Sequence, residues 1–168
     1  DGVTIAAALW YCDLRGFTAM SEILPRDEVI ELLNDYFSCM AAPVRARGGE
    51  VLKFIGDAML AIFPIADDLD RDRACVTALD GARQALADFS RLNQRRRAAG
   101  KPTLEMGLAL HTGTVTYGNI GAPDRLDFTV IGQAVNEASR ISSMCQSAGR
   151  SVLVSSAFRN ALPDEDRE

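Results

Sequence analysis

Two carboxylates stand at the ends of apolar segments of this sequence. Asp13 follows the apolar run of residues 4–12, and Asp57 lies between the two short apolar runs within residues 50–63. A buried carboxylate needs a partner, and two that lie close together repel one another. Divalent cations remove this repulsion, and Mg²⁺ is commonly held by one or two carboxylates together with substrate phosphates. Asp13 and Asp57 are therefore candidate metal ligands, with the capping of turns as the alternative interpretation.

The segment between Asp13 and the next apolar pattern is a candidate phosphate site. It contains Gly16, Phe17 and Thr18, follows a predicted strand and leads toward a helix. Backbone N–H groups in such a position bind phosphate as a nest or a helix N-terminus does. The chain contains no G-x-x-x-x-G-K-[ST] segment, which excludes a P-loop of the Walker type.

Three further polar residues occur where chemistry or packing would explain them. Asn136 and Arg140 lie four residues apart on a predicted helix and so share one face. An amide and a guanidinium there can hold a ribose oxygen and a developing phosphoryl charge, or simply face solvent. Lys53 interrupts the apolar run of residues 51–55, where it either reaches past the sheet edge or contacts a ligand.

The elements that must position these residues follow from hydrophobic periodicity. Helical spacing begins at Pro25 and should bend or end near Pro43, before the Gly48-Gly49 stop. A hairpin is expected over 50–63 with Asp57 at its tip. The other expected elements are strands at 4–12, 104–111, 115–120, 128–131 and 151–154, and helices at 67–100, at 133–146 and from 155. This order predicts an α+β fold of the ferredoxin-like βαββαβ type, a mostly antiparallel sheet with long helices packed on one face.

Composition limits the possible functions. The chain has 168 residues, 48% of them hydrophobic, which suits one globular domain with one buried core. Its 18 Lys and Arg against 23 Asp and Glu give a net charge of −5, so a partner such as nucleic acid or an anionic membrane is not expected. Cys12, Cys39, Cys75 and Cys145 form no C-x-x-C pair, which favours reduced, buried thiols in the cytosol over zinc or redox chemistry.

The first residue is Asp rather than Met, so we expect a piece of a longer protein, with an attached regulatory or sensor domain outside it. No apolar run approaches the about 20 residues that span a bilayer. The domain is expected in the cytoplasm, although the full-length protein could be anchored to a membrane.

Four ordered segments resemble the catalytic domain of the class III nucleotidyl cyclases, the adenylyl and guanylyl cyclases. They cover most of the chain and comprise residues 13–18, 48–61, 111–121 and 127–140. The resemblance implies a single cyclase catalytic domain over residues 1–168. The chain stops at Glu168, short of the closing C-terminal hairpin of many members, so we expect the last strands of the sheet to be missing.

The resemblance implies a role for each polar residue singled out above. Asp13 and Asp57 match the two aspartates that bind two Mg²⁺ or Mn²⁺ ions. Lys53 matches the residue that contacts the purine edge in adenylyl cyclases, where guanylyl cyclases usually have Glu. Thr129 matches the second purine-reading position, as in the bacterial and soluble subgroup that uses Thr or Ser in place of Asp.

Three more positions complete the set that the resemblance implies. Asn136 and Arg140 match the pair that orients the ribose and stabilises the transition state. Arg150 falls where the family often has a Lys or Arg on the terminal phosphate. The single histidine, His111, falls in a strand, where a packing or dimer-interface role is expected rather than general-base catalysis.

The expected activity is that of an adenylate cyclase, a phosphorus–oxygen lyase that converts ATP to 3′,5′-cyclic AMP and pyrophosphate in intracellular signal transduction. Adenine N1 accepts and N6 donates, so a Lys ammonium and a Thr hydroxyl can satisfy both, whereas guanine presents the opposite pattern. The resemblance further implies a homodimer in which the metal aspartates of one chain face the base-reading and transition-state residues of the other. The alternatives are a guanylate cyclase, a non-catalytic dimer that binds nucleotide, and a relative of the diguanylate cyclases or polymerase palms.

Overall fold

The computed structural model describes residues 2–167, except for the side chains of residues 125–128. Its elements in chain order are β1 (Gly2–Leu14), α1 (Phe17–Ile23), α2 (Arg26–Ala46), β2 (Glu50–Ile55), β3 (Ala58–Ile65), α3 (Asp68–Ala98), β4 (Met106–Ala122), β5 (Arg125–Ile131), α4 (Gln133–Ala148), β6 (Val152–Val154), α5 (Ser156–Asn160) and the 3₁₀ turn Asp164–Asp166. This order confirms the predicted α+β class.

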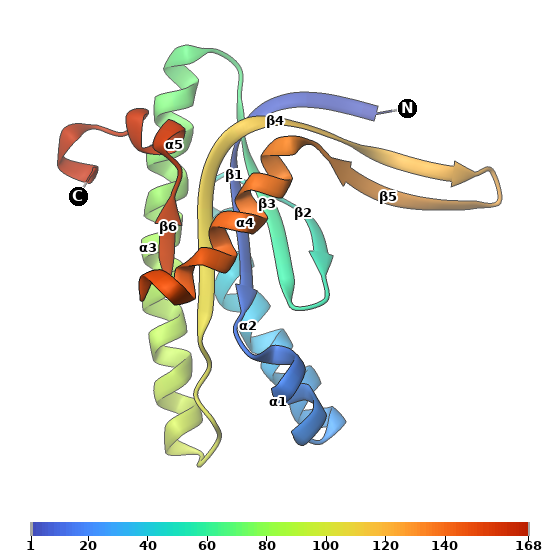
Figure 1. Ribbon diagram of the computed structural model, residues 1–168, viewed down its shortest axis with the longest axis vertical. Coiled ribbons are helices and arrows are strands. Elements are labelled where there is room, and N and C mark those ends of the chain that lie inside the picture. Colours follow the sequence, from blue (N-terminus) through green and yellow to red (C-terminus); the bar gives the residue numbers. More distant parts are fainter. Residues whose placement is uncertain (1, 168) are drawn as a thin grey trace.

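The strands form one sheet in the order β2-β3-β1-β4-β5, with β6 attached to β4 (Figure 1). Every pair along that order is antiparallel, and the β4–β6 pair is parallel. The mostly antiparallel sheet predicted from the sequence is therefore confirmed. Beyond the body of the sheet, β4 and β5 continue as a two-stranded arm that projects away from the other elements (Figure 1).

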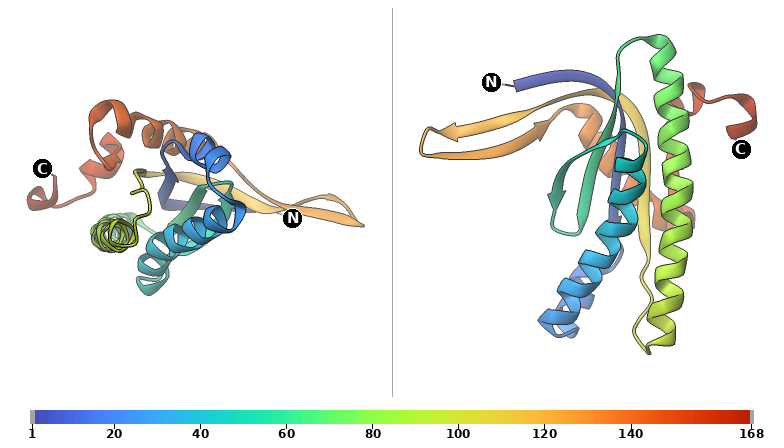
Figure 2. Two further views of the ribbon diagram at one scale, coloured as in Figure 1. Left: turned by 90° about the horizontal axis from the view of Figure 1, so that it is seen from below. Right: turned by 180° about the vertical axis from the view of Figure 1, so that it is seen from behind.

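Helices cover both faces of the sheet (Figure 2). Trp10 and Cys12 of β1 pack in the larger core with buried side chains of α2 and α3. Ala7 and Leu9, which alternate with them, pack on the other face with Ala134 of α4. The prediction of helices on one face was thus right for the two long helices and wrong for α4, because both sets of alternating β1 side chains are apolar and need cover.

A turn predicted at residues 112–114 is absent. Residues 106–122 form the single strand β4, in which positions 112–114 pair continuously with residues 6–8 of β1. Thr-Gly-Thr resembles a turn in isolation, but a long neighbouring strand offers these residues a full set of backbone hydrogen bonds. Local turn propensity is weaker than that pairing.

Two helical details also differ from the prediction. The sequence pattern did not predict α1, which is only seven residues long and contributes no fully buried side chain. Helix α2 continues through Pro43 to Ala46, and the Pro43 side chain is buried. Because Pro43 lies in the last turn, its missing N–H interrupts little of the helix, and the chain then reverses at Gly48 and Gly49.

All four cysteines are buried and unpaired. Burial raises the pKa of the Cys12 and Cys75 thiols to about 12 and also raises the pKa of Cys39 and Cys145. Thiolate chemistry is therefore not available to the folded domain near neutral pH.

Among the described residues no helix has the length and apolar character required to cross a membrane.

We expect the native domain to react slowly with a thiol reagent such as Ellman's reagent, and all four thiols to react once the protein is unfolded. Cys39 is the least covered, with 8% of its surface exposed, so it should react first. Replacing it by serine should remove the fastest phase of the native reaction. Rapid reaction of several thiols in the native protein would contradict the burial described above.

Candidate active site

The structure brings Asp13 and Asp57 together at one end of the sheet. Strands β1 and β3 are neighbours, and Cys12 pairs with Met59, so the β2–β3 turn lies beside the end of β1. The backbone N–H of Leu14 donates a hydrogen bond to Oδ2 of Asp57 at 3.1 Å. This contact fixes the hairpin tip against the residue that follows Asp13.

Asp13 is half-buried, and its environment disfavours the charged form. Burial is the largest cause that raises the pKa of its carboxyl, and the negative charge of Asp57 raises it further. A hydrogen bond from Ser142 and the positive charge of Arg15 act in the opposite direction. The Ser142 hydroxyl donates to Oδ1 of Asp13 at 3.0 Å. Two carboxylates held this way attract a cation, which would relieve both the repulsion and the burial of charge.

The donor set fits a hard divalent ion bound jointly with a substrate. Among the described side chains, which leave out those of residues 125–128, no group of three or more His, Cys, Asp and Glu is placed to hold a metal. In the described part of the chain, the candidate site therefore consists of two carboxylates, with no thiolate or imidazole beside them. Mg²⁺ and Mn²⁺ accept oxygen ligands and commonly complete their coordination with phosphate oxygens and water.

The candidate phosphate segment lies directly after Asp13. Gly16 precedes α1 with a φ of 63°, a conformation that residues with a side chain rarely adopt, and no side chain caps the helix. Phe17 and Thr18 form the first turn of α1. The geometry therefore places their backbone N–H groups at the same end of the sheet as the two aspartates.

Lys53 lies on the same face of the sheet as Asp13. It pairs with Leu60 of β3, which in turn pairs with Tyr11 of β1. Directly paired residues share a face, and Tyr11 and Asp13 point to the same side because they are two residues apart. A register shift between Val51 and Lys53 sets this orientation. Lys53 is thus half-buried on the face that α4 covers in part.

Thr129 lies far along the sheet from Asp13. Asp13 pairs with Gly107 and Thr129 pairs with Gly118, positions eleven residues apart on β4. Eleven residues of extended chain correspond to a contour of about 36 Å. Thr129 is half-buried on the projecting arm, while the side chains of residues 127 and 128, which belong to the same sequence segment, lie outside the described residues. One chain therefore does not bring Thr129 to its own aspartates.

Asn136 and Arg140 project from the outer side of α4. Both are exposed, whereas the inward side of the helix carries four buried residues, Ala134, Ala138, Ser142 and Cys145. The predicted pair therefore shares one face of the helix, as its spacing of four residues requires.

Close contacts fix α4 on β4. A side chain at Gly113 would come within 2.4 Å of the Ala134 Cβ, so the helix approaches the strand there as closely as glycine allows. His111, only 8% exposed, contacts Glu137 through Nε2 at 2.8 Å and Ser155 through Nδ1 at 2.7 Å. These contacts support the packing role expected for His111.

The sequence analysis missed Ser142, Glu137 and Gly107. Ser142 continues the buried spacing of Ala134 and Ala138 and is the one polar residue on that stripe, which is a readable signal. Glu137 and Gly107 gave no such signal, because their partners are on other elements.

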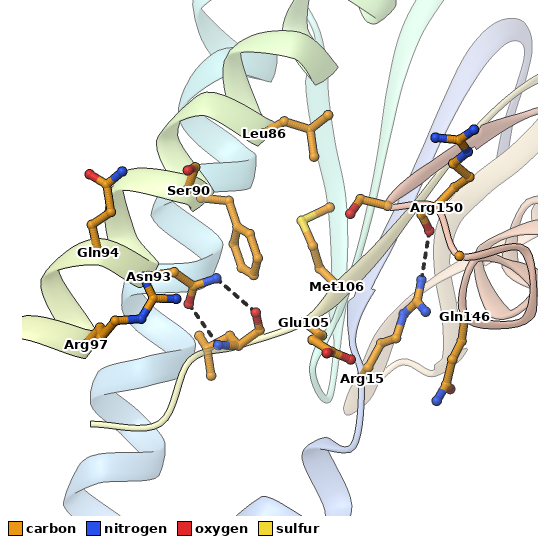
Figure 3. A pocket seen from close by; sticks show the side chains of 14 residues that line it. Arg15, Leu86, Ser90, Asn93, Gln94, Arg97, Glu105, Met106, Gln146 and Arg150 are labelled. Atoms are coloured by element: carbon orange, nitrogen blue, oxygen red, sulfur yellow. Dashed lines mark hydrogen bonds between the residues drawn. The ribbon is translucent and has the colours of Figure 1, made fainter. Parts of the chain in front are cut away.

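Arg150 lies on the wall of a cavity of about 640 Å³ between α3, the start of β4 and the end of α4 (Figure 3). Its carbonyl oxygen accepts a hydrogen bond from Nη2 of Arg15 at 3.3 Å, and its own guanidinium points away from Arg15 (Figure 3). Arg15 is two residues from Asp13, so Arg150 lies at the end of the sheet that carries the aspartates of its own chain.

We expect Asp13→Asn to raise the melting temperature of the metal-free protein at neutral pH. The amide keeps an acceptor for Ser142 and removes a charge that burial and Asp57 disfavour. Because the folded pKa of Asp13 is raised, the carboxylate lowers stability as pH rises from its unfolded pKa through its folded pKa, and the gain disappears below about pH 4. Solvent screens this half-exposed site, so the rise should not exceed about 2–4 °C.

Thermal melts of both proteins in chelator, at acidic and at neutral pH, measure this difference. Asp72→Asn, at an exposed position of α3, is the matched control and should change little. A lower melting temperature for Asp13→Asn at neutral pH would show that the carboxylate is stabilising in the absence of metal.

Comparisons with known proteins identify the family of this chain. Residues 3–167 match the family described as the adenylate and guanylate cyclase catalytic domain. The adenylate cyclase of Anabaena cylindrica is 40% identical over 154 residues, which are 89% of this chain and 30% of that protein. The chain thus spans less than a third of the length of this relative.

Two solved structures have the same fold. The adenylyl cyclase CyaB from P. aeruginosa has a TM-score of 0.81 at 30% identity, covering 96% of this chain and 82% of that chain. The guanylyl cyclase Cya2 has a TM-score of 0.79 at 32% identity, covering 97% and 81%. The chain belongs to the family of adenylate and guanylate cyclase catalytic domains.

Proposed function

We propose that this domain is an adenylate cyclase that converts ATP to 3′,5′-cyclic AMP and pyrophosphate with two divalent cations, at sites shared by two copies of the chain. The observation that carries the proposal is the half-buried pair Asp13 and Asp57, in which the Leu14 N–H donates to Asp57 and the Ser142 hydroxyl donates to Asp13. A nearby relative with adenylate cyclase activity in its name supports the choice of reaction.

In this proposal Asp13 and Asp57 hold the cations, which are Mg²⁺ or Mn²⁺. When bound, the ions would acidify the ribose 3′-hydroxyl and neutralise the charge on the leaving phosphates. The backbone N–H groups of residues 16–18 bind the polyphosphate beside them. Arg150 is the candidate for the terminal phosphate, and its place near Arg15 leaves it at the end of the sheet that holds the aspartates.

The reaction needs no nucleophile from the protein. The ribose 3′-oxygen attacks the α-phosphorus, the bond from this phosphorus to the bridging oxygen breaks, and the hydroxyl proton passes to solvent. Asn136 orients the ribose, and Arg140 donates to the α-phosphoryl oxygens as negative charge develops on them. Their exposure on the outer side of α4 leaves both side chains available to a substrate.

Lys53 and Thr129 select adenine. The Lys53 ammonium donates to N1, and the Thr129 hydroxyl oxygen accepts from N6. Guanine would present an N–H group to the lysine, so a donor would face a donor. This reasoning favours ATP over GTP, although the relatives include a guanylyl cyclase of similar identity.

Two copies are required because the residues of one chain are divided. Thr129 lies eleven residues along β4 from the level of Asp13, on the arm that projects away from the other elements, so the arm carries it away from the aspartates of its own chain (Figure 1). A head-to-tail dimer would place the arm and α4 of one chain over the aspartates of the other. Each chain holds the full set, so a C2 homodimer would have two equivalent sites. A non-catalytic nucleotide-binding dimer is the second candidate, and a test of turnover separates the two.

We expect the isolated variants Asp57→Ala and Arg140→Ala to be nearly inactive, with a loss of about 10²–10³ in kcat for Arg140→Ala. Mixing them should restore about a quarter of the wild-type activity, because random exchange makes half of the dimers mixed and each mixed dimer has one intact site. Cyclic AMP formation from ATP and Mn²⁺ measures this over a protein concentration series.

The same assay with the wild-type domain should give activity that rises faster than linearly with protein concentration. The exposed Asp72→Asn variant should behave as wild type. Activity in the separate variants equal to that of their mixture would argue against shared sites. Absence of any cyclic nucleotide from dimeric wild-type protein, with bound ATP, would favour the non-catalytic alternative.

Changing the base-reading lysine should change the choice of nucleotide. We expect Lys53→Glu to lower kcat/KM for ATP by about tenfold or more, the cost of one charged hydrogen bond, and to raise the ratio of GTP to ATP turnover. Lys53→Met removes the charge without adding an acceptor and should lower ATP turnover without favouring GTP. Competition between ATP and GTP in one reaction measures the ratio. An unchanged ratio in both variants would show that Lys53 does not read the base.

A further inference from the structure

Ser142 is a buried hydroxyl that the mechanism above does not use. It is 1% exposed on the inward side of α4. Its hydroxyl oxygen lies 3.0 Å from Oδ1 of Asp13 and 3.2 Å from the Gly107 carbonyl oxygen. A hydroxyl has one proton, so these two acceptors share it. Ser142 is thus the side chain through which α4 contacts a candidate metal ligand.

Glycine at position 107 makes this contact possible. Gly107 pairs directly with Asp13 on the neighbouring strand. A Cβ at Gly107 would lie 2.8 Å from the Ser142 carbonyl oxygen and 3.0 Å from Nη2 of Arg15. Any side chain there would push the helix outward, and the Ser142 hydroxyl would lose Asp13. The position of α4 on the sheet and the orientation of Asp13 therefore both depend on the close approach of Ser142 to Gly107.

The same helix carries Asn136 and Arg140 on its outer side. Arg140 is two residues from Ser142, and Asn136 lies about 9 Å from Ser142 along the axis of α4, toward its N-terminus. The helix is held at that end by the Gly113–Ala134 contact and by the contact between His111 and Glu137. Because α4 is a continuous helix, a displacement at Ser142 would move Arg140, two residues away, rather than be absorbed by a loop.

We propose that Ser142 is a positioning residue that orients Asp13 for metal binding, and that α4 thereby links the two active sites of the dimer. This inference rests on the proposed function, in which Asn136 and Arg140 of a chain act on the metal-bound substrate of its partner. The inward side of α4 senses the metal site of its own chain through Ser142. Its outer side presents Arg140 to the other site. Metal binding at one site therefore changes the position of Arg140 at the other site.

The first test measures metal binding without substrate. Mn²⁺ titrated into the metal-free homodimer, followed by the paramagnetic resonance of free Mn²⁺, should show about tenfold weaker binding for Ser142→Ala, the usual effect of losing a partner of a metal ligand. Ser142→Thr, which keeps the hydroxyl, should bind more tightly than Ser142→Ala. Ser143→Ala is the matched control, since the neighbouring Ser143 is exposed and its hydroxyl bonds only the Arg140 carbonyl.

The second test uses mixed dimers with a single competent site. A chain with Arg140→Ala supplies the aspartates of that site, and a chain with Asp57→Ala supplies its Asn136 and Arg140. Ser142→Ala added to the Arg140→Ala chain should shift the metal dependence of the competent site. Added to the Asp57→Ala chain, whose own metal site is already disabled, it should lower kcat by about two- to thirtyfold, while the metal dependence stays unchanged.

Each part of the proposal can fail separately. Equal Mn²⁺ affinity in Ser142→Ala and Ser143→Ala would overturn the positioning role. If adding Ser142→Ala to the Asp57→Ala chain leaves kcat of the mixed dimer unchanged, the link through α4 is overturned. If the two parent variants fail to restore activity on mixing, the shared-site dimer itself is wrong and the link falls with it, while the Mn²⁺ titration still decides the role of Ser142. Melting curves of every variant confirm that the protein remains folded.

Discussion

The structure depends on holding two carboxylates side by side in a place that disfavours the charge on one of them, Asp13. Asp13 is half-buried, and its pKa is raised by burial and by the charge of Asp57. The fold nevertheless keeps the two residues together, through the pairing of β1 with β3, the Leu14 N–H on Asp57 and the Ser142 hydroxyl on Asp13. Under the proposed function, the binding of a cation would relieve both the repulsion between the two carboxylates and the cost of burying the charge of Asp13.

The residues around this pair belong to different elements for a geometric reason. Antiparallel strands bring the end of β1 and the β2–β3 turn to one end of the sheet, whereas the long strand β4 carries β5 away from it. A chain arranged this way cannot surround a small substrate by itself. In the proposed head-to-tail dimer, two copies would surround it, and α4 would then face one site with its inner side and the other site with its outer side.

Much of the fold and of the candidate site could be predicted from the sequence, and the features that were missed were missed for identifiable reasons. Asp13, Asp57, Asn136 and Arg140 were accessible because their positions follow from local patterns, namely the end of an apolar strand, the tip of a hairpin and a helical spacing of four. The continuity of β4 was missed because residues 112–114 look like a turn until their partners on β1 are known. Ser142 and Gly107 were missed because each has meaning only through a residue far away in the chain, Asp13 in both cases.

The uninterrupted course of β4 also limits how a gene for this domain can vary in length. Along this 17-residue strand, one register relates Gly107 to Asp13 and Gly118 to Thr129. Adding or removing one codon between these two glycines would turn every later side chain to the opposite face of the sheet. A substitution in this part of β4 changes the contacts of one side chain. The insertion of one residue would instead exchange the buried and the exposed side chains along the rest of the strand. Length variation is therefore expected in the loops that join the elements, with the interval between Gly107 and Gly118 kept constant.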